Sequence, residues 1–561
     1  MRKYKDDLPK DIRKKNMKKT IRTIAQILFC ITVVTFVTIY IKFPKMYKED
    51  NKANWNQSNG FIALSYVGVA RKDNNDLVSI ERLDSHLKAL HEAGYVSIGI
   101  DDIINFYEKG SPLPEKALYL TFEDGRKDSM IFAQKVLEKY NFKATMMSYA
   151  GNVVSKDRIF IKEKELKYLD ENSFWEIGTN GYRFSYINVF DKNENIEDED
   201  KDGKYKKEKF KYNHYLMDYI RDEDGIPLES KSEMRDRINW DYKRMKEIYE
   251  DALEYNPKAY AIMHANAIYE NINEAVEDVN LENIYDQFDI MFNREGSCYN
   301  TSKTNKYNLT RMQVGSDWSV NKLLMEIKSW TDSKTPYVVG DEEAVSRWAI
   351  KGGVMNQDDN KLILTSPKGE KSFAYLKGSD TWKDIDLSLY LSGRDFGTQS
   401  VYLKYLDSNN YIKMMLKNNI IYIIEKTESS KEKVVFKSEM PNADKLPEID
   451  DNFDLDRIDG NENYDESVTD KKYDSFDINH QLSRTYKSNE SSMESPVSWK
   501  ISVQIKDSNM SIMVGNKILA NDIVINDKLN YGGFAIECYS NNDEIYDGVY
   551  DELTVSPINE E

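Results

Sequence analysis

The segment that decides the fold is KALYLTFEDGRKDS, residues Lys116–Ser129. Its apolar part, Ala117–Phe122, predicts a short buried strand that runs directly into the sequence Glu-Asp-Gly at 123–125. Two carboxylates at the end of a buried strand are costly to desolvate unless they meet a metal, a proton or a charged partner. In α/β folds, active sites lie at that end of the strands. The same carboxylates would also suit the N-terminal cap of a helix over Asp128–Tyr140, and spacing by itself leaves both interpretations open.

The region from Gly60 to Lys328 resembles the polysaccharide deacetylase family of carbohydrate esterases, with the matching segments in the family's order. The segment quoted above resembles the family's first motif. The other matching segments are the opening strand Phe61–Tyr66, the first helix and turn Ser79–Gly94, the strand Phe142–Thr145 and the strand Trp175–Gly178. The resemblance implies a deformed (β/α) barrel in which a divalent metal polarises an N-acetyl carbonyl and activates a water molecule.

The family's catalytic residues map only in part onto this sequence. Its aspartate base corresponds to Glu123 and its carboxylate metal ligand to Asp124, whereas the two histidines of its His-x-x-x-His motif correspond to Asn180 and Phe184. An amide is a poor ligand for zinc, cobalt or nickel, and a phenyl ring offers no lone pair. Glutamate is one methylene longer than aspartate, and a displacement of roughly an ångström costs about a hundredfold in rate. We therefore expect a degenerate domain without a metal or another cofactor.

His264 is a candidate replacement ligand that would restore a metal site. It follows the apolar segment Ala259–Met263, a predicted strand whose end should face the same cleft. A rearranged site of Glu123, Asp124 and His264 would have ligand types that suit zinc, whereas the plainer interpretation is a hydrogen-bonded histidine at a strand end.

Three residues are candidates for binding substrate: Tyr66, Arg311 and His264. Tyr66 precedes Val67, where the family usually has Tyr-His. Arg311 corresponds to a basic residue near the family's active-site rim, although it would equally suit a structural role.

The N-terminal residues predict a membrane anchor. Residues 1–22 are dense in Lys and Arg, and residues 23–41 carry no charge, which at the helical rise spans about 30 Å of hydrocarbon. A cleaved signal peptide would have a shorter apolar core and a small-residue cleavage site. We expect a cytoplasmic tail (1–22), a transmembrane helix (23–43) and a stalk (44–59), in a single-pass protein of the cell membrane whose C-terminal body is extracellular.

Composition supports an exported body. The net charge is −18 although the N-terminal segment is strongly basic, so the remainder is more acidic still, which argues against nucleic acid or anionic lipid as a partner. The three cysteines, Cys30, Cys298 and Cys538, fall in different predicted segments and form no disulfide framework. His86 and His91 lie in an amphipathic helical pattern and are expected on the surface.

After the N-terminal segments, the sequence divides into two predicted domains. The deacetylase-like domain is expected over residues 60–332, with a polar insertion at 191–231 that has a weak helix near Tyr215–Arg221, and a linker follows at 333–343. Short alternating segments over 344–558 predict a β-sandwich, interrupted by an acidic tract at 441–498 that we expect to be disordered. The sandwich resembles concanavalin/laminin-G-like jelly rolls at three places: Trp382–Ile385, Asn409–Tyr411 and Gly532–Phe534. Such sandwiches commonly bind sugars, and others are purely structural.

These features favour one function over two others. The first is a catalytically inactive, membrane-anchored deacetylase-like protein that binds or guides a cell-surface polysaccharide or exopolysaccharide, with a membrane polysaccharide synthase as its expected partner. The alternative is an active metal-dependent deacetylase of N-acetylhexosamine polymers with the rearranged site. A glycoside hydrolase ranks last, because retaining chemistry needs two acids about 5 Å apart and nothing in the sequence pairs Glu123 with a second one.

Overall fold

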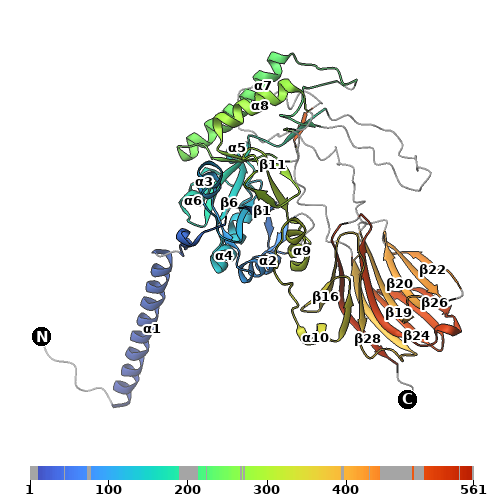
Figure 1. Ribbon diagram of the computed structural model, residues 1–561. Coiled ribbons are helices and arrows are strands. Elements are labelled where there is room, and N and C mark those ends of the chain that lie inside the picture. The colour runs from blue at the N-terminus through green and yellow to red at the C-terminus, as the bar shows by residue number, and fades with distance from the viewer. Residues whose placement is uncertain are drawn as a thin grey trace. The chain divides into compact units, whose positions relative to one another are not determined.

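The structure is a computed structural model that describes residues 10–42, 45–57, 59–72, 77–188, 213–222, 224–263, 265, 268–269, 272–392, 397–428, 430–441, 483–485, 498–542 and 544–558 (Figure 1). The chain divides into two compact units, Met1–Lys48 and Glu49–Glu561. His264 and most of the two polar tracts predicted at 191–231 and 441–498 lie outside the described residues.

The N-terminal unit is built on the helix α1 (Lys10–Lys42). Large apolar side chains along α1 are exposed, among them Ile24, Leu28 and Phe29. Within the described residues, no helix is both long enough and apolar enough to cross a membrane. The transmembrane helix predicted at 23–43 therefore stays a prediction.

Seven parallel strands form a closed barrel in the second unit. Their order around the barrel is β1 (Gly60–Tyr66), β13 (Leu309–Gln313), β11 (Ile290–Glu295), β10 (Ala259–Ala261), β7 (Trp175–Gly181), β6 (Ala144–Tyr149) and β5 (Ala117–Phe122), and β5 pairs with β1 to close it. Every residue of β1, β5 and β6 is buried, as expected for parallel strands covered on both faces. The deformed (β/α) barrel is confirmed.

Helices and short strands surround this barrel (Figure 1). The helices are α2 (Ile80–Glu92), α3 (Ile100–Lys109), α4 (Lys127–Tyr140), α5 (Ala150–Val154), α6 (Glu163–Glu171), α7 (Lys231–Leu253), α8 (Glu274–Gln287) and α9 (Val320–Trp330). The shorter strands are β2 (Val69–Ala70), β3 (Val78–Ser79), β4 (Val96–Ser97) beside β5, and β12 (Tyr299–Thr301), which is antiparallel to β1. A separate three-stranded sheet contains β8 (Ser185–Ile187), β9 (Asn213–His214) and β23 (Ser483–Thr485).

His86 contradicts the prediction that it lies on the surface. Its side chain is fully buried in α2. The ring Nδ1 lies 3.1 Å from the Tyr66 hydroxyl and Nε2 lies 3.0 Å from the carbonyl oxygen of Trp318. Burial lowers the pKa of His86 to about 3, with Arg82 adding to the effect. The helical pattern placed His86 beside the apolar face of the helix. It did not show that Tyr66 and Trp318 would provide hydrogen-bond partners for a buried ring.

The weak helix predicted near Tyr215–Arg221 is also wrong. These residues form turns and extended backbone, with Tyr215 almost fully buried. Arg237, from α7, donates hydrogen bonds to the backbone carbonyl oxygens of Tyr215 and Asp218 and forms an ion pair with Glu229. These tertiary contacts satisfy the backbone in an irregular conformation, which removes the need for helical hydrogen bonds.

The C-terminal part is a sandwich of two antiparallel sheets, each of seven strands. The first sheet has the order β14 (Trp348–Lys351), β17 (Ser372–Leu376), β27 (Gly533–Ser540), β19 (Gly397–Asp407), β20 (Asn410–Lys417), β21 (Ile420–Lys426) and β22 (Lys433–Glu439). The second has the order β15 (Val354–Asp358), β16 (Lys361–Ser366), β28 (Tyr546–Pro557), β18 (Ile385–Ser392), β24 (Ser498–Lys506), β25 (Asn509–Val514) and β26 (Lys517–Val524). The short helix α10 (Glu342–Ser346) precedes β14.

Alternating burial along the strands defines the sandwich core. In β18, for example, Leu387, Leu389 and Leu391 are buried, whereas the residues between them are more exposed. One continuous apolar cluster fills the space between the two sheets. The predicted β-sandwich is confirmed, and all three cysteines are free, as expected.

Candidate functional site at the mouth of the barrel

Glu123 and Asp124 lie in a tight turn that directly follows β5. Asp124 and Gly125 both have a φ of 64°, in the left-handed region. A Cβ at Gly125 would lie 2.5 Å from the Cβ of Ser148, so this position requires glycine. The next helix, α4, has Arg126 as its N-cap residue. Neither Glu123 nor Asp124 caps that helix, so the capping interpretation is wrong.

Glu123 lies inside the barrel with no exposed surface. Its Oε1 accepts hydrogen bonds from Ser65 Oγ at 2.6 Å, Thr121 Oγ1 at 3.1 Å and Arg311 Nε at 2.9 Å. Its Oε2 accepts from Asn180 Nδ2 at 2.8 Å. These four donors come from β1, β5, β7 and β13, so the carboxylate links four strands of the barrel. It is held as a buried anion and has no open face toward the mouth.

Arg311 completes a buried ion pair with Glu123. The guanidinium is 1% exposed and its Nη2 also lies 3.4 Å from Glu295 Oε1. Burial opposes the charge of Arg311, but Glu123 and Glu295 more than offset that effect and raise its pKa above the ordinary value. A buried pair of this kind is strongly destabilised when one partner is removed. Of the two roles that the sequence left open for Arg311, the geometry supports the structural one.

Asn180 occupies the first of the two expected histidine positions, and both ends of its amide are engaged. Oδ1 accepts from the backbone N–H of Asp124 at 3.1 Å. Nδ2 donates to Glu123 and, at 2.9 Å, to the carbonyl oxygen of Ala261. The side chain therefore fixes the turn after β5 and orients Glu123.

Phe184 occupies the second histidine position and is 8% exposed. Its ring packs against Tyr149 and His214, with centroid distances of 6.3 Å and 6.1 Å. The residues present at the two histidine positions thus do not fit the metal that the resemblance implies, because one is a hydrogen-bonded amide and the other a hydrocarbon ring. Among the described residues, which exclude His264, no group of three or more His, Cys, Asp and Glu is arranged to hold a metal ion.

Asp124 differs from Glu123 in its surroundings. Its side chain is partly exposed, and in the described part of the chain its carboxyl group has no hydrogen-bond partner. Burial, together with the negative charge of Glu123, raises the pKa of Asp124 to about 7 against the opposing influence of Arg126 and Arg311. The mouth of the barrel therefore presents one carboxyl group that exchanges its proton near neutral pH.

Tyr66, which the sequence suggests for substrate binding, is fully buried beneath the site. Its ring stacks on Phe122 with centroids 5.7 Å apart, and its hydroxyl meets His86. The structure thus brings Glu123, Asp124, Asn180 and Arg311 together and leaves Tyr66 in the core. Sequence reasoning missed Ser65 and Thr121 as partners of Glu123. Their signal was present, since each is a hydroxyl residue inside an otherwise apolar strand.

Comparison with known proteins agrees with this barrel. Residues 110–284 match the family model described as polysaccharide deacetylase. This stretch is therefore similar to polysaccharide deacetylase domains. The chain is 23% identical over 205 residues to the poly-β-1,6-N-acetyl-D-glucosamine N-deacetylase of Staphylococcus aureus, a match that covers 34% of this chain and 68% of that protein. A Bacillus subtilis protein named as a polysaccharide deacetylase is 25% identical over 128 residues, 22% of this chain and 45% of its own length.

The chain thus spans less than half of the Bacillus relative and about two thirds of the staphylococcal one. Among solved structures, the de-N-acetylase of Aggregatibacter actinomycetemcomitans is 16% identical with a TM-score of 0.36, covering 48% of this chain and 99% of that one.

Proposed function

We propose that this chain is a membrane-anchored, extracytoplasmic protein whose deacetylase domain binds or guides a polysaccharide and is catalytically inactive. The Glu123 network carries the proposal. A general base must have a free lone pair directed at the water it activates. The carboxylate of Glu123 instead accepts from four donors inside the barrel, one of which is the buried cation Arg311.

The donor set supports the same conclusion. Asn180, at the position of one family histidine, forms hydrogen bonds with both Glu123 and Asp124. Phe184, at the position of the other, packs in an aromatic cluster. Asp124 is the one carboxyl group of the pair that remains available at the mouth. A partly exposed carboxyl group can accept hydrogen bonds from sugar hydroxyls, which is a binding role.

The relatives and the sequence support the proposed ligand and location. The staphylococcal relative is named for a polymer of N-acetylglucosamine. We propose an N-acetylhexosamine polymer at the cell surface as the ligand, and a membrane polysaccharide synthase as the partner of the anchored chain. The charge-free run at 23–41 behind a basic segment supports the anchor.

An active deacetylase with a site of Glu123, Asp124 and His264 is the alternative, and the free carboxyl group of Asp124 favours it. One assay separates the two. The full chain in detergent is incubated with N-acetylglucosamine oligomers and with zinc, cobalt or nickel, and acetate release is followed for the natural chain and for Asp124→Ala. We expect no metal-dependent release. Turnover that needs metal and disappears in Asp124→Ala would overturn catalytic inactivity.

A further inference from the structure

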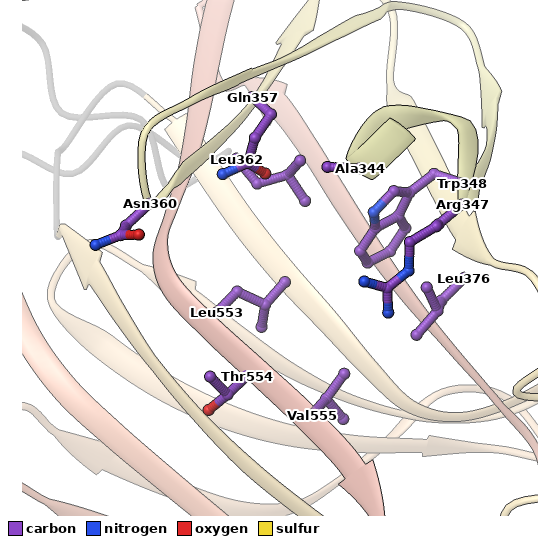
Figure 2. Close-up of a pocket in the computed structure, with 10 residues that line it drawn as sticks. All are labelled: Ala344, Arg347, Trp348, Gln357, Asn360, Leu362, Leu376, Leu553, Thr554 and Val555. Atoms are coloured by element: carbon purple, nitrogen blue, oxygen red, sulfur yellow. The ribbon is translucent and has the colours of Figure 1, made fainter. Parts of the chain in front are cut away.

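The β-sandwich contains a pocket that the deacetylase resemblance does not explain. It has a volume of about 320 Å³ and lies beside α10, between residues of β14–β17 and β28 (Figure 2). This volume falls at the lower end of the range of small-ligand sites, roughly 300–1,000 Å³, which suits a single sugar unit.

One side of the pocket is aliphatic. The indole of Trp348 lies beside this aliphatic surface, which consists of Leu362, Leu376, Leu553 and Val555 (Figure 2). Trp348 is 9% exposed, and within the described residues its Nε1–H has no hydrogen-bond partner. Figure 2 shows this nitrogen on the edge of the ring that faces the pocket. A buried indole normally finds a partner for its N–H, so this donor is left for a ligand.

Arg347 provides the second donor. Its side chain is exposed, its guanidinium reaches over the pocket, and no partner for it occurs among the described residues (Figure 2). No acidic residue lines the pocket. Arg347 and Trp348 are therefore two donors beside an apolar surface, while Gln357, Asn360 and Thr554 are the other polar residues of the lining. A matching ligand offers an acceptor oxygen next to a small apolar group.

We propose that this pocket binds an N-acetylhexosamine unit through its acetamido group. The carbonyl oxygen accepts from Arg347 and Trp348, and the methyl group packs on Leu362 and Leu553. A free amino sugar lacks both features and brings a positive charge toward Arg347. The inference rests on the proposed function and specifies it: the sandwich recognises the acetylated form of the polysaccharide that the chain binds.

Calorimetric titration and saturation-transfer NMR test the proposal. The full chain in detergent is titrated with an N-acetylglucosamine pentamer, with the fully deacetylated pentamer and with a galacturonate oligomer. We expect the acetylated pentamer to bind at least about tenfold more tightly than the other two, with the strongest saturation transfer at the acetyl methyl protons. Arg347→Ala should weaken this binding about tenfold or more, since it removes charge-assisted hydrogen bonds.

Two further variants make the result decisive. Lys351→Ala changes an exposed cation of β14 that does not line the pocket and should bind as the natural chain does. Trp348→Phe keeps a ring, removes the N–H and should weaken binding several-fold, with thermal melting used to check that each variant folds.

The outcomes also separate this inference from the proposed function. Binding of the acetylated pentamer that is equal in Arg347→Ala and Lys351→Ala would overturn the pocket and leave the proposed function standing. Absence of binding to the natural chain would contradict both. Preference for the galacturonate oligomer would overturn the acetamido assignment.

Discussion

Glu123 and Asp124 are neighbours in sequence, yet their environments give them opposite properties. Glu123 is inside the barrel and fully hydrogen-bonded, whereas Asp124 is at the mouth with a free carboxyl group. The left-handed turn that begins at Asp124 separates the two side chains. The residue at the position of the family's base is thus held in a buried ion pair, and the residue at the position of the family's carboxylate ligand has a pKa raised to about 7.

Glu123→Gln should strongly destabilise the barrel. The substitution keeps the shape of the side chain but leaves the Arg311 guanidinium buried, with Glu295 at 3.4 Å as its remaining carboxylate. We expect a loss of about 3–5 kcal/mol in the free energy of unfolding, the usual result of breaking a buried pair. Urea denaturation measures it.

Glu163→Gln is the matched control for that measurement. Glu163 forms an exposed pair with Lys167 four residues along α6, which is worth only about 0.5 kcal/mol or less. If Glu123→Gln lost no more stability than Glu163→Gln, the structural role assigned to the buried carboxylate would be wrong.

Asp124 makes stability depend on pH. Its pKa rises from 3.8 to about 7 on folding, chiefly through burial, so the folded chain holds the proton more tightly than the unfolded chain does. This contribution to stability is full below about pH 4 and is lost as the pH rises through about 7. Asp124→Asn cannot ionise, so we expect it to gain stability relative to the natural chain as the pH is raised from 4 to 8.

Urea denaturation at several pH values checks this dependence. Asp278→Asn is the control, because Asp278 is an exposed residue of α8. Parallel pH profiles for the natural chain and Asp124→Asn would show that Asp124 does not titrate in this range.

At the scale of elements, the N-terminus of α9, the last helix of the barrel domain, forms hydrogen bonds with a carboxylate of the sandwich. Ser319 is the N-cap residue of α9, and its hydroxyl accepts from the backbone N–H of Lys322. The backbone N–H and the hydroxyl of Ser319 both donate to Asp547, each at 2.9 Å. Thr365 donates to the same carboxylate at 2.6 Å. A negative charge at a helix N-terminus is also favoured by the helix dipole.

Asp547→Ala should therefore weaken the coupling between α9 and the sandwich. The change leaves two donors of Ser319 and the hydroxyl of Thr365 without their shared acceptor, and we expect a loss of about 1–3 kcal/mol. Differential scanning calorimetry should show the single transition broaden or split. Asp551→Ala, on the same strand β28, should leave the transition unchanged, and equal effects of the two variants would contradict this role of Asp547.

At the scale of the whole molecule, the predicted anchor is testable independently of the chemistry. We expect the full chain to sediment with membranes and a chain without residues 1–44 to remain in the supernatant. Because the charge-free run at 23–41 would contribute apolar burial along its whole length, high salt should not extract the full chain, whereas detergent should. Extraction by salt alone would indicate a purely electrostatic attachment through the basic segment.

Local patterns determined much of the architecture. The apolar segment Ala117–Phe122 was recognisable as a strand, and it has those bounds in the structure. The alternating segments after residue 344 likewise predicted the sandwich. Such patterns suffice because burial of one face or of a whole strand leaves a periodic trace in the chain itself.

Only the tertiary structure decided which groups the motif residues contact. Three of the four partners of Glu123 lie far from it in sequence: Asn180 is 57 residues away, Ser65 is 58 and Arg311 is 188. No local pattern reports that three such distant groups converge on one carboxylate, because their proximity follows from closure of the barrel by β5 and β1. The sequence thus determined which residues stand at the barrel mouth, while closure determined which carboxylate is buried as an ion pair and which remains free.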